Sequence, residues 1–316
     1  MLKILIISPR YTGGIGGHAS MLASKLIEYG FDVKKMNVPH IPIKNLKNPS
    51  FAVFGTLKGL FCRENYDIVH SFNLPSVFAM RYTRGRKKIL SLHGVFSEQI
   101  KTLHSSILSS IASNTETRVL KWVDRLTTDS HATQKSYKTK LGYDLEYLPS
   151  AIDTSKFNDL PEIRKIENQI AYVGRDGYEK GIDILRKIEP EINGKVVYCT
   201  NLPWIEAMKT LSASVMLVVP SRMESLPTII KEAFYLKIPV IATNVGGIPE
   251  LISHNETGVL VDPENPKQLR DAINNLIEKK DLAKRLTLNA YDFVTKNLTW
   301  DSVLPKYIKF YENLLA

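Results

Sequence analysis

Short runs of apolar residues alternate with amphipathic stretches along the chain, and this series occurs twice. Residues 3–8 (KILIIS) form a continuous, β-branched run, which is typical of a strand buried on both faces of a parallel sheet. The strands predicted in the first half are 3–8, 67–71, 88–92 and 125–129. The strands predicted in the second half are 169–174, 195–199, 214–220 and 238–243. Strands that alternate with helices indicate two doubly wound α/β domains with parallel sheets.

The helices between these strands follow from an apolar period near 3.6. One helix is expected from about His18 to Tyr29, because Leu22 and Leu26 share a stripe and Gly30 can end it. Later helices are expected at 269–276 and 300–316.

The polar segment 150–168 has no sustained apolar period and separates the two series of strands. We therefore predict a first domain at 1–160, a second domain at 161–298 and a closing helix at 299–316. A chain of 316 residues is long enough to give each of two domains its own core.

Cysteine content and the first residues indicate a cytoplasmic location. Cys62 and Cys199 are far apart and have no metal-ligand spacing, which fits a reducing compartment. The opening MLKILIISPR is too short and too soon polar for a signal peptide and predicts a first strand instead. No apolar run approaches the roughly 18–20 residues that a membrane span requires.

The net charge of +10 lies entirely in the first half of the chain. Residues 1–168 contain 24 Lys and Arg against 14 Asp and Glu, which gives +10, and residues 169–316 contain 18 of each. Such asymmetry indicates an anionic partner for the first domain, and a solvated basic surface is the alternative. We expect no nucleic-acid partner.

Two segments of the first half together predict peripheral contact with an anionic membrane at the inner face of the cell. Five cations fall within eight residues: Arg81, Arg84, Arg86, Lys87 and Lys88. The segment 51–61 (FAVFGTLKGLF) is strongly apolar and contains a single lysine. Cations and inserted apolar residues together supply the two signals that stable attachment needs. The alternatives are that 51–61 is a core helix and that the cations serve a soluble anionic acceptor.

Glycines cluster at the junction of the first predicted strand and helix. The sequence Gly13-Gly14-Ile15-Gly16-Gly17 opens the helix, where glycines allow a close backbone approach and free N–H groups can bind phosphate. The spacing differs from the GxGxxG dinucleotide motif. A tight turn without a ligand is the alternative.

The equivalent junction of the second half carries cations. Gly174-Arg175 and Lys180-Gly181 follow the strand at 169–174, and an arginine fork with a lysine point charge suits a diphosphate. Solvated loop cations are the alternative interpretation.

A pair of carboxylates at the next junction is the most specific motif. Glu224 and Glu232 stand eight residues apart, and Pro227 suits the first position of the helix between them. The N–H groups of Thr228 and Ile229 would then be available to a diphosphate. A capping glutamate and a surface glutamate are the alternative.

With these motifs the chain resembles glycosyltransferase family 4, a large retaining family with the GT-B fold. The resemblance covers nearly the whole chain. Its motifs lie at Gly13–Gly17, Leu148–Phe157, Gly174-Arg175, Lys180-Gly181, Pro220-Ser221, Glu224, Glu232-Ala233, Asn244–Glu250 and Glu256–Val261. The chain departs from the family at Ser225-Leu226-Pro227, where Gly-Phe-Gly is common, and Pro227 has no N–H to offer the sugar.

The resemblance implies two Rossmann-like domains facing a cleft, with a C-terminal helix that crosses back to the first. It implies that Arg175 and Lys180 neutralise the donor diphosphate, that Glu232 holds the ribose and that Glu224 contacts the transferred sugar. His93 resembles the histidine beside the donor sugar. The catalytic residues would be Glu224, His93, Arg175 and Lys180. The donor-binding residues would be Gly14, Gly16, Gly174, Arg175, Lys180, Ser225, Leu226, Thr228, Ile229 and Glu232.

The implied reaction is retaining transfer of a hexose-type sugar from a nucleotide-diphosphate sugar to an acceptor, such as a lipid-linked or cell-surface glycan. The leaving diphosphate would depart from the front face and take the acceptor proton. No Asp-x-Asp motif stands in a matching context, so we expect no metal and no cofactor beyond the donor itself. A sugar-nucleotide epimerase, a phosphorylase and a non-catalytic sugar-nucleotide-binding subunit stay open as alternatives, as does the nucleotide base.

Overall fold

The chain folds into two compact units, which are described here one at a time. The computed structural model describes residues 2–9, 14–41, 43, 46–94 and 114–316. The first unit comprises Met1–Ala151 together with Trp300–Ala316, and the second comprises Ile152–Thr299. The second unit thus begins earlier than the residue 161 predicted from the sequence.

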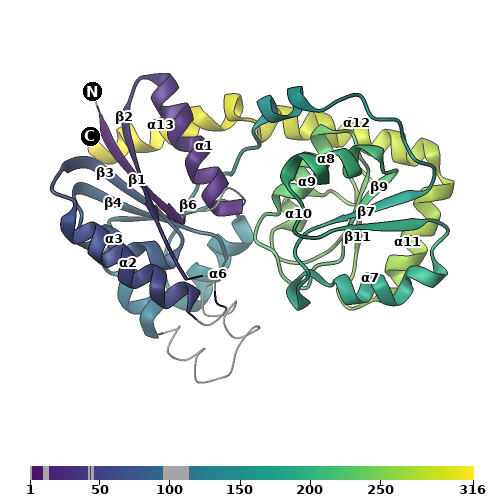
Figure 1. Ribbon diagram of the computed structural model, residues 1–316, viewed down its shortest axis with the longest axis horizontal. Coiled ribbons are helices and arrows are strands. Elements are labelled where there is room, and N and C mark those ends of the chain that lie inside the picture. The colour runs from purple at the N-terminus through teal and green to yellow at the C-terminus, as the bar shows by residue number, and fades with distance from the viewer. Residues whose placement is uncertain (1, 10–13, 42, 44–45, 95–113) are drawn as a thin grey trace. The chain divides into compact units, whose positions relative to one another are not determined.

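The first unit is built on a six-stranded parallel sheet with the order β2-β1-β3-β4-β5-β6 (Figure 1). Its strands are β1 (Lys3–Pro9), β2 (Asp32–Val38), β3 (Asn65–Phe72), β4 (Arg84–Leu92), β5 (Arg125–Thr128) and β6 (Glu146–Tyr147). Its helices are α1 (Gly14–Tyr29), α2 (Lys47–Phe61), the 3-10 helix η1 (Leu74–Ser76), α3 (Val77–Tyr82), α6 (His131–Leu141) and α13 (Trp300–Leu315).

Both faces of this sheet are covered, because successive residues of β1 enter different cores. Ile4 and Ile6 pack with α1 and α13 on one face. Leu5 and Ile7 pack with α2 and α3 on the other. A strand that is apolar on both faces must be buried on both, which explains the uninterrupted run KILIIS.

A buried histidine fastens α13 to this sheet. His70 in β3 lies 2.7 Å from the Tyr311 hydroxyl through Nδ1 and 2.7 Å from Ser91 Oγ through Nε2. Burial holds the pKa of His70 well below its usual value, so the ring is neutral at physiological pH. The neutral ring satisfies two hydroxyl groups inside an apolar core.

The second unit is built on a five-stranded parallel sheet with the order β11-β10-β9-β7-β8. Its strands are β7 (Gln169–Val173), β8 (Lys195–Cys199), β9 (Met216–Val219), β10 (Val240–Thr243) and β11 (Val259–Val261). Its α-helices are α7 (Ile182–Ile188), α8 (Trp204–Ala213), α9 (Thr228–Tyr235), α10 (Ile248–Leu251), α11 (Pro266–Glu278) and α12 (Lys280–Asn297). Its 3-10 helices are η2 (Thr154–Asp159), η3 (Tyr178–Lys180) and η4 (Glu189–Glu191).

The eight predicted strands are confirmed, and two details of the predicted helices are wrong. Helix α1 begins at Gly14 rather than near His18, so the glycines form its first turn. Pro227 caps α9 with an extended backbone, and Thr228 is the first helical residue. An extended conformation suits proline as well as the first helical position does, so composition could not separate the two positions.

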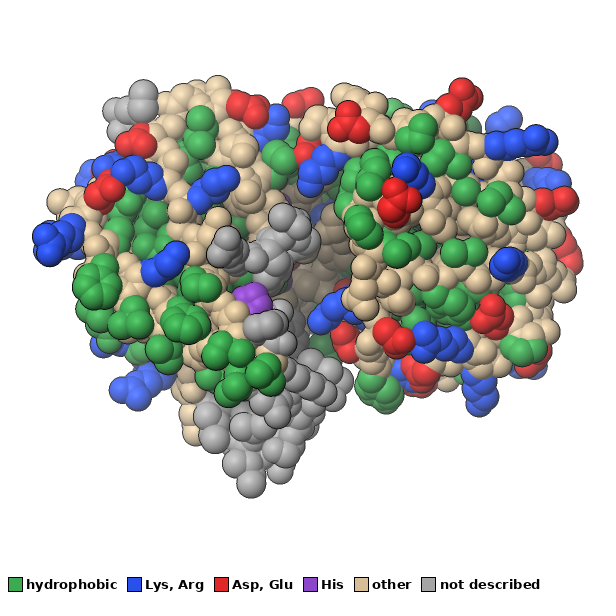
Figure 2. Space-filling model, viewed as in Figure 1, with side chains coloured by type: hydrophobic (Ala, Val, Ile, Leu, Met, Phe, Trp, Pro, Cys, Tyr) green, Lys and Arg blue, Asp and Glu red, His purple; other side chains and the backbone are tan. Residues whose placement is uncertain are grey.

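The apolar segment 51–61 is neither a fully buried helix nor a fully exposed one. It forms most of α2, whose inner side packs on α3 so closely that a Cβ at Gly59 would lie 2.3 Å from the Ala79 carbonyl oxygen. Its outer side is apolar as well. The large hydrophobic side chains exposed on and just before α2 are Ile41, Ile43, Leu46, Val53, Leu57, Leu60 and Phe61. Figure 2 shows hydrophobic side chains gathered over this part of the first unit.

Among the residues that the structure describes, no helix is both long and apolar enough to cross a membrane.

Candidate functional site

The structure joins two of the predicted site residues directly. Lys180 Nζ lies 2.7 Å from Glu224 Oε1, and Ser221 Oγ donates to the same oxygen at 2.9 Å. Lys180 ends η3 beyond β7, whereas Glu224 follows β9, and β7 and β9 are neighbours in the sheet. The carboxyl ends of adjacent parallel strands therefore bring the two residues to the edge where such sheets bind ligands.

Two glycines allow this approach. Gly181 has a φ of +64°, and a Cβ there would lie 1.9 Å from the Pro220 carbonyl oxygen. Gly246 has a φ of +54°, and a Cβ there would lie 1.8 Å from the Glu224 carbonyl oxygen. Both contacts are with backbone, which cannot move aside easily, so a side chain at either position would displace the loop that carries Glu224.

Arg222 ties the two loops together, and sequence reasoning missed it. Its backbone N–H donates to the Glu179 carbonyl at 2.9 Å, and its guanidinium donates to both carboxylate oxygens of Asp183. The guanidinium also lies 4.0 Å from the centre of the Tyr178 ring. Paired in this way, Arg222 fixes the turn that presents Lys180.

Arg175 lies at the expected junction but is more open than Lys180. It follows Gly174 at the end of β7, its side chain is 73% exposed, and its guanidinium lies 3.0 Å from Glu179 Oε1. Tyr172 Oη donates to the Arg175 carbonyl at 2.7 Å and so holds the backbone. The Glu179 side chain is only 15% exposed, so the pair is anchored at its carboxylate while the guanidinium stays open to a bound anion.

Glu232 is held by an aromatic residue that the sequence did not single out. Trp204 Nε1 donates to Glu232 Oε1 at 2.8 Å, and Phe157 packs edge-on against the same indole. Burial raises the pKa of Glu232, and the indole hydrogen bond opposes that rise. The Trp204 bond fixes one carboxylate oxygen and so sets the orientation of the other.

The start of α9 provides backbone donors. The first N–H groups of any helix have no partner within it, so those of Thr228 and Ile229 are suited to an anion. The Leu226 side chain is buried in the core of the second unit, so only its backbone can meet a ligand. Ser225 is half-buried in the same loop.

In the first unit, Gly14 and Gly16 belong to the first turn of α1. Gly14 has a φ of +51° and is exposed, so a ligand can approach the backbone closely there, whereas Gly16 is buried. The preceding Gly13 lies outside the described residues.

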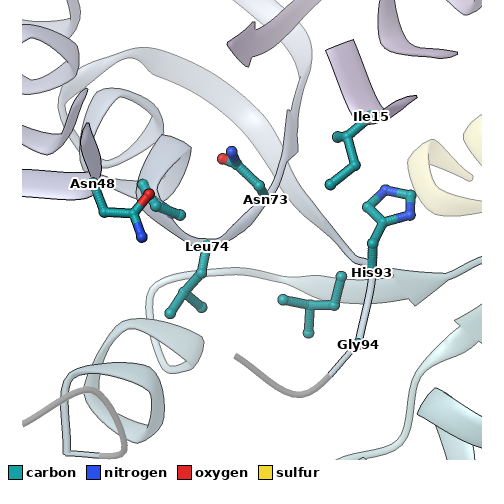
Figure 3. A pocket seen from close by; sticks show the side chains of 8 residues that line it. Ile15, Asn48, Asn73, Leu74, His93 and Gly94 are labelled. Atoms are coloured by element: carbon teal, nitrogen blue, oxygen red, sulfur yellow. The ribbon is translucent and has the colours of Figure 1, made fainter. Parts of the chain in front are cut away.

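His93 follows β4 and lines a cavity of about 150 Å³ within the first unit (Figure 3). The cavity is lined by Ile15, Asn48, Asn73, Leu74, Pro75, Leu92, His93 and Gly94. Asn73 has a φ of 91°, which is strained for a residue with a side chain, and its amide oxygen accepts from the Ser76 N–H. Such strain at the carboxyl edge of a parallel sheet is typical of a ligand site.

Three of the five clustered cations have partners within the first unit. The Lys88 ammonium donates to the Arg81 carbonyl, and burial lowers the pKa of Lys88. Arg81 stacks on the Trp122 ring at 3.9 Å, and Arg86 lies 3.6 Å from Asp67. Arg84 is the first residue of β4 and Lys87 lies a few residues further along the same strand. These cations are therefore near the opposite end of β4 from His93.

Comparisons with known proteins identify the class of fold to which the two units belong. The chain matches the model of Glycosyltransferase Family 4 over residues 6–156 and that of Glycosyl transferases group 1 over residues 187–293. The crystal structure of Anabaena HepE in complex with UDP-glucose superposes with a TM-score of 0.74 at 14% identity, covering 99% of this chain and 100% of that one. The two Rossmann-like units therefore form the GT-B fold.

Curated relatives include an uncharacterized glycosyltransferase of Methanocaldococcus jannaschii, which is 26% identical over 99% of both chains. They also include the GDP-mannose-dependent alpha-(1-6)-phosphatidylinositol monomannoside mannosyltransferase of Mycobacterium tuberculosis, which is 26% identical over 52% of this chain and 55% of its own length. Together with the two family models, these relatives support glycosyltransferase function for the chain.

Proposed function

We propose that this protein is a retaining, metal-independent glycosyltransferase that transfers a hexose-type sugar from a nucleotide-diphosphate sugar. The observation that carries the proposal is the Lys180–Glu224 pair, which places a cation and a carboxylate at the carboxyl ends of two adjacent strands. The complex of HepE with UDP-glucose, a protein of the same fold, supports a nucleotide sugar as donor.

The residues divide the chemistry among them. Lys180, Arg175 and the N–H groups at the start of α9 stabilise the charge that grows on the diphosphate as its bond to the sugar breaks. The bond from the sugar carbon to the acceptor oxygen forms on the same face, and the acceptor proton passes to the departing phosphate oxygen. Glu224 holds the transferred sugar, and Glu232 holds the ribose.

A donor screen and a transfer assay test this function. We expect thermal-shift stabilisation by one of UDP, GDP, ADP and dTDP, and transfer of sugar from the matching donor.

Activity should persist in EDTA, because protein cations and a helix end already partner the phosphates. A saturable Mg²⁺ requirement would contradict the metal-independent site. Release of an epimerised or phosphorolysed donor without transfer would favour an epimerase or a phosphorylase, and binding without turnover would favour a non-catalytic subunit.

The acceptor side of the proposal rests on the outer side of α2. Phe61 is 79% exposed and Leu60 is 55% exposed, and they share that side with Val53 and Leu57. Helix α3 packs on the inner side of α2 and leads directly to the exposed cations Arg84 and Arg86. An exposed apolar helix face and exposed cations in the same unit are the two features that suit the surface of an anionic membrane and hence a lipid-linked acceptor. The phosphatidylinositol-based acceptor named for the mycobacterial relative supports this class.

Flotation with vesicles tests the membrane contact. The protein should float with anionic vesicles and not with neutral ones, and salt should release it. Replacing Leu57 and Leu60 together with serine should lower the membrane partition constant by about 100-fold or more, because each leucine gives up roughly 1.5–3 kcal/mol of burial. The matched control replaces Ile166 and Leu288, both 53% exposed in the second unit, with serine. The proposed membrane surface would be rejected if the two double variants floated equally well. It would also be rejected if the wild-type protein did not float with anionic vesicles at low salt.

A further inference from the structure

Three consecutive strands of the first unit end near three polar residues, and the middle one, Asp129, contacts the other two. His93 follows β4, Asp129 follows β5, and Ser150 lies just beyond β6. His93 Nδ1 lies 3.1 Å from Asp129 Oδ1, and Ser150 Oγ donates to Asp129 Oδ2 at 2.9 Å. The order of contacts follows the order of the strands, because Leu92 of β4 pairs with Thr128 of β5 immediately before them.

The contact fixes which ring nitrogen carries a proton. The Asp129 side chain is 6% exposed, and as a carboxylate it can only accept hydrogen bonds. The Nδ1 atom of His93 must therefore donate to it, and the Ser150 hydroxyl donates from the other side. In the neutral ring Nε2 then carries no proton and can accept a hydrogen bond.

We propose that Asp129 is a positioning residue for the transfer reaction, which holds His93 in the Nδ1–H tautomer so that Nε2 accepts a hydrogen bond from a substrate hydroxyl. This inference rests on the proposed function, and on the position of His93 in the wall of the 150 Å³ cavity. A hydroxyl is the polar group that a hexose presents at most of its carbon atoms. The pair lies at the carboxyl edge of a parallel sheet, which is where such sheets bind ligands.

The test replaces Asp129 with asparagine, which preserves shape and removes the charge. The amide can donate to Nδ1, so the proton moves to Nε2, which then can no longer accept from the hydroxyl. We expect ¹⁵N NMR of the neutral ring to show the tautomer change for His93, with its signal identified by comparison with His93→Gln. We expect kcat to fall by about two- to tenfold, as for loss of a hydrogen bond between neutral groups. Asp129→Glu should restore part of the activity.

Two further variants separate positioning from folding. Thr127→Val alters a buried hydroxyl of β5 that bonds to Ser91, two residues from Asp129, and should change neither tautomer nor kcat. In a His93→Gln background, Asp129→Asn should lower kcat no further, because it acts through the ring. Where Asp129→Asn fails to fold, Ser150→Ala should give a smaller loss of the same kind.

Any of three results would overturn the inference. The first is an unchanged kcat in Asp129→Asn, and the second is an unchanged His93 tautomer in that variant. The third is that Asp129→Asn lowers kcat as much in the His93→Gln background as in the wild type. The tautomer measurement needs no turnover. Absence of transfer activity in the wild type would therefore count against the proposed function alone, whereas a wrong tautomer would count against Asp129 alone.

Discussion

Replacing Lys180 with alanine should weaken nucleoside-diphosphate binding by about 10- to 100-fold, because each hydrogen bond to a charged group contributes roughly 1.5–3 kcal/mol. Lys180 is the cation that the fold holds most firmly at the strand edge, between Glu224 and the tight turn at Gly181. Isothermal titration calorimetry measures the loss, with the nucleotide that the thermal-shift screen selects. Arg175→Ala should weaken binding less, since its side chain is exposed and already shares its charge with Glu179.

The Lys180 variant needs a control for stability, because it leaves a nearly buried carboxylate without its cation. The Glu224 side chain is 10% exposed, so Lys180→Ala should also lower the melting temperature. Adding Glu224→Gln should restore the melting temperature and leave nucleotide binding weak. Lys187→Ala, an exposed lysine of α7, should change neither property. Nucleotide binding of wild-type strength in Lys180→Ala would exclude the residue from the donor site.

The second large effect is a division of labour between the two glutamates. Glu224→Ala should lower turnover by about tenfold or more with a smaller effect on free-nucleotide binding, because Glu224 is assigned to the sugar. Glu232→Ala should weaken free-nucleotide binding by a similar factor, because it is assigned to the ribose. Calorimetry with free nucleotide and steady-state rates on both variants measure the contrast.

Trp204→Phe provides the matching control for Glu232. It removes the indole N–H that orients the carboxylate and keeps an aromatic ring against Phe157. Nucleotide binding should fall less than in Glu232→Ala, because the carboxylate itself is retained. Equal losses of nucleotide binding in Glu224→Ala and Glu232→Ala would reject the division of labour.

The sequence predicted the buried strands well because burial on both faces leaves a continuous apolar run, as in β1 and β9. It did not predict β2, whose sequence DVKKMNV carries adjacent lysines. An edge strand needs only one neighbour and tolerates charge, so its pattern resembles that of a loop. Likewise, the two sides of α2 are both apolar, and periodicity alone could not tell which side the fold leaves exposed.

The candidate site was predictable where a motif is local and not where it depends on pairing between strands. Glu224 and Glu232 lie within one strand–helix junction, so spacing alone suggested them. Trp204 and Asp129 reach their partners through the sheet order, across 28 residues to Glu232 and 36 residues to His93. Sequence separation of this size carries no signal of contact in a single chain.

The return of α13 to the first unit sets the order in which a growing chain can fold. Trp300, Val303 and Tyr311 fill the core between α1 and the sheet, where Tyr311 also bonds to His70. On the ribosome, residues 152–299 are synthesised between the two parts of that unit. The second unit can therefore complete its core first, although its synthesis starts later. Until α13 is synthesised, the face of the first unit that α13 covers stays exposed and hydrophobic. During that interval the unfinished first unit is the part of the nascent protein that chaperones would meet.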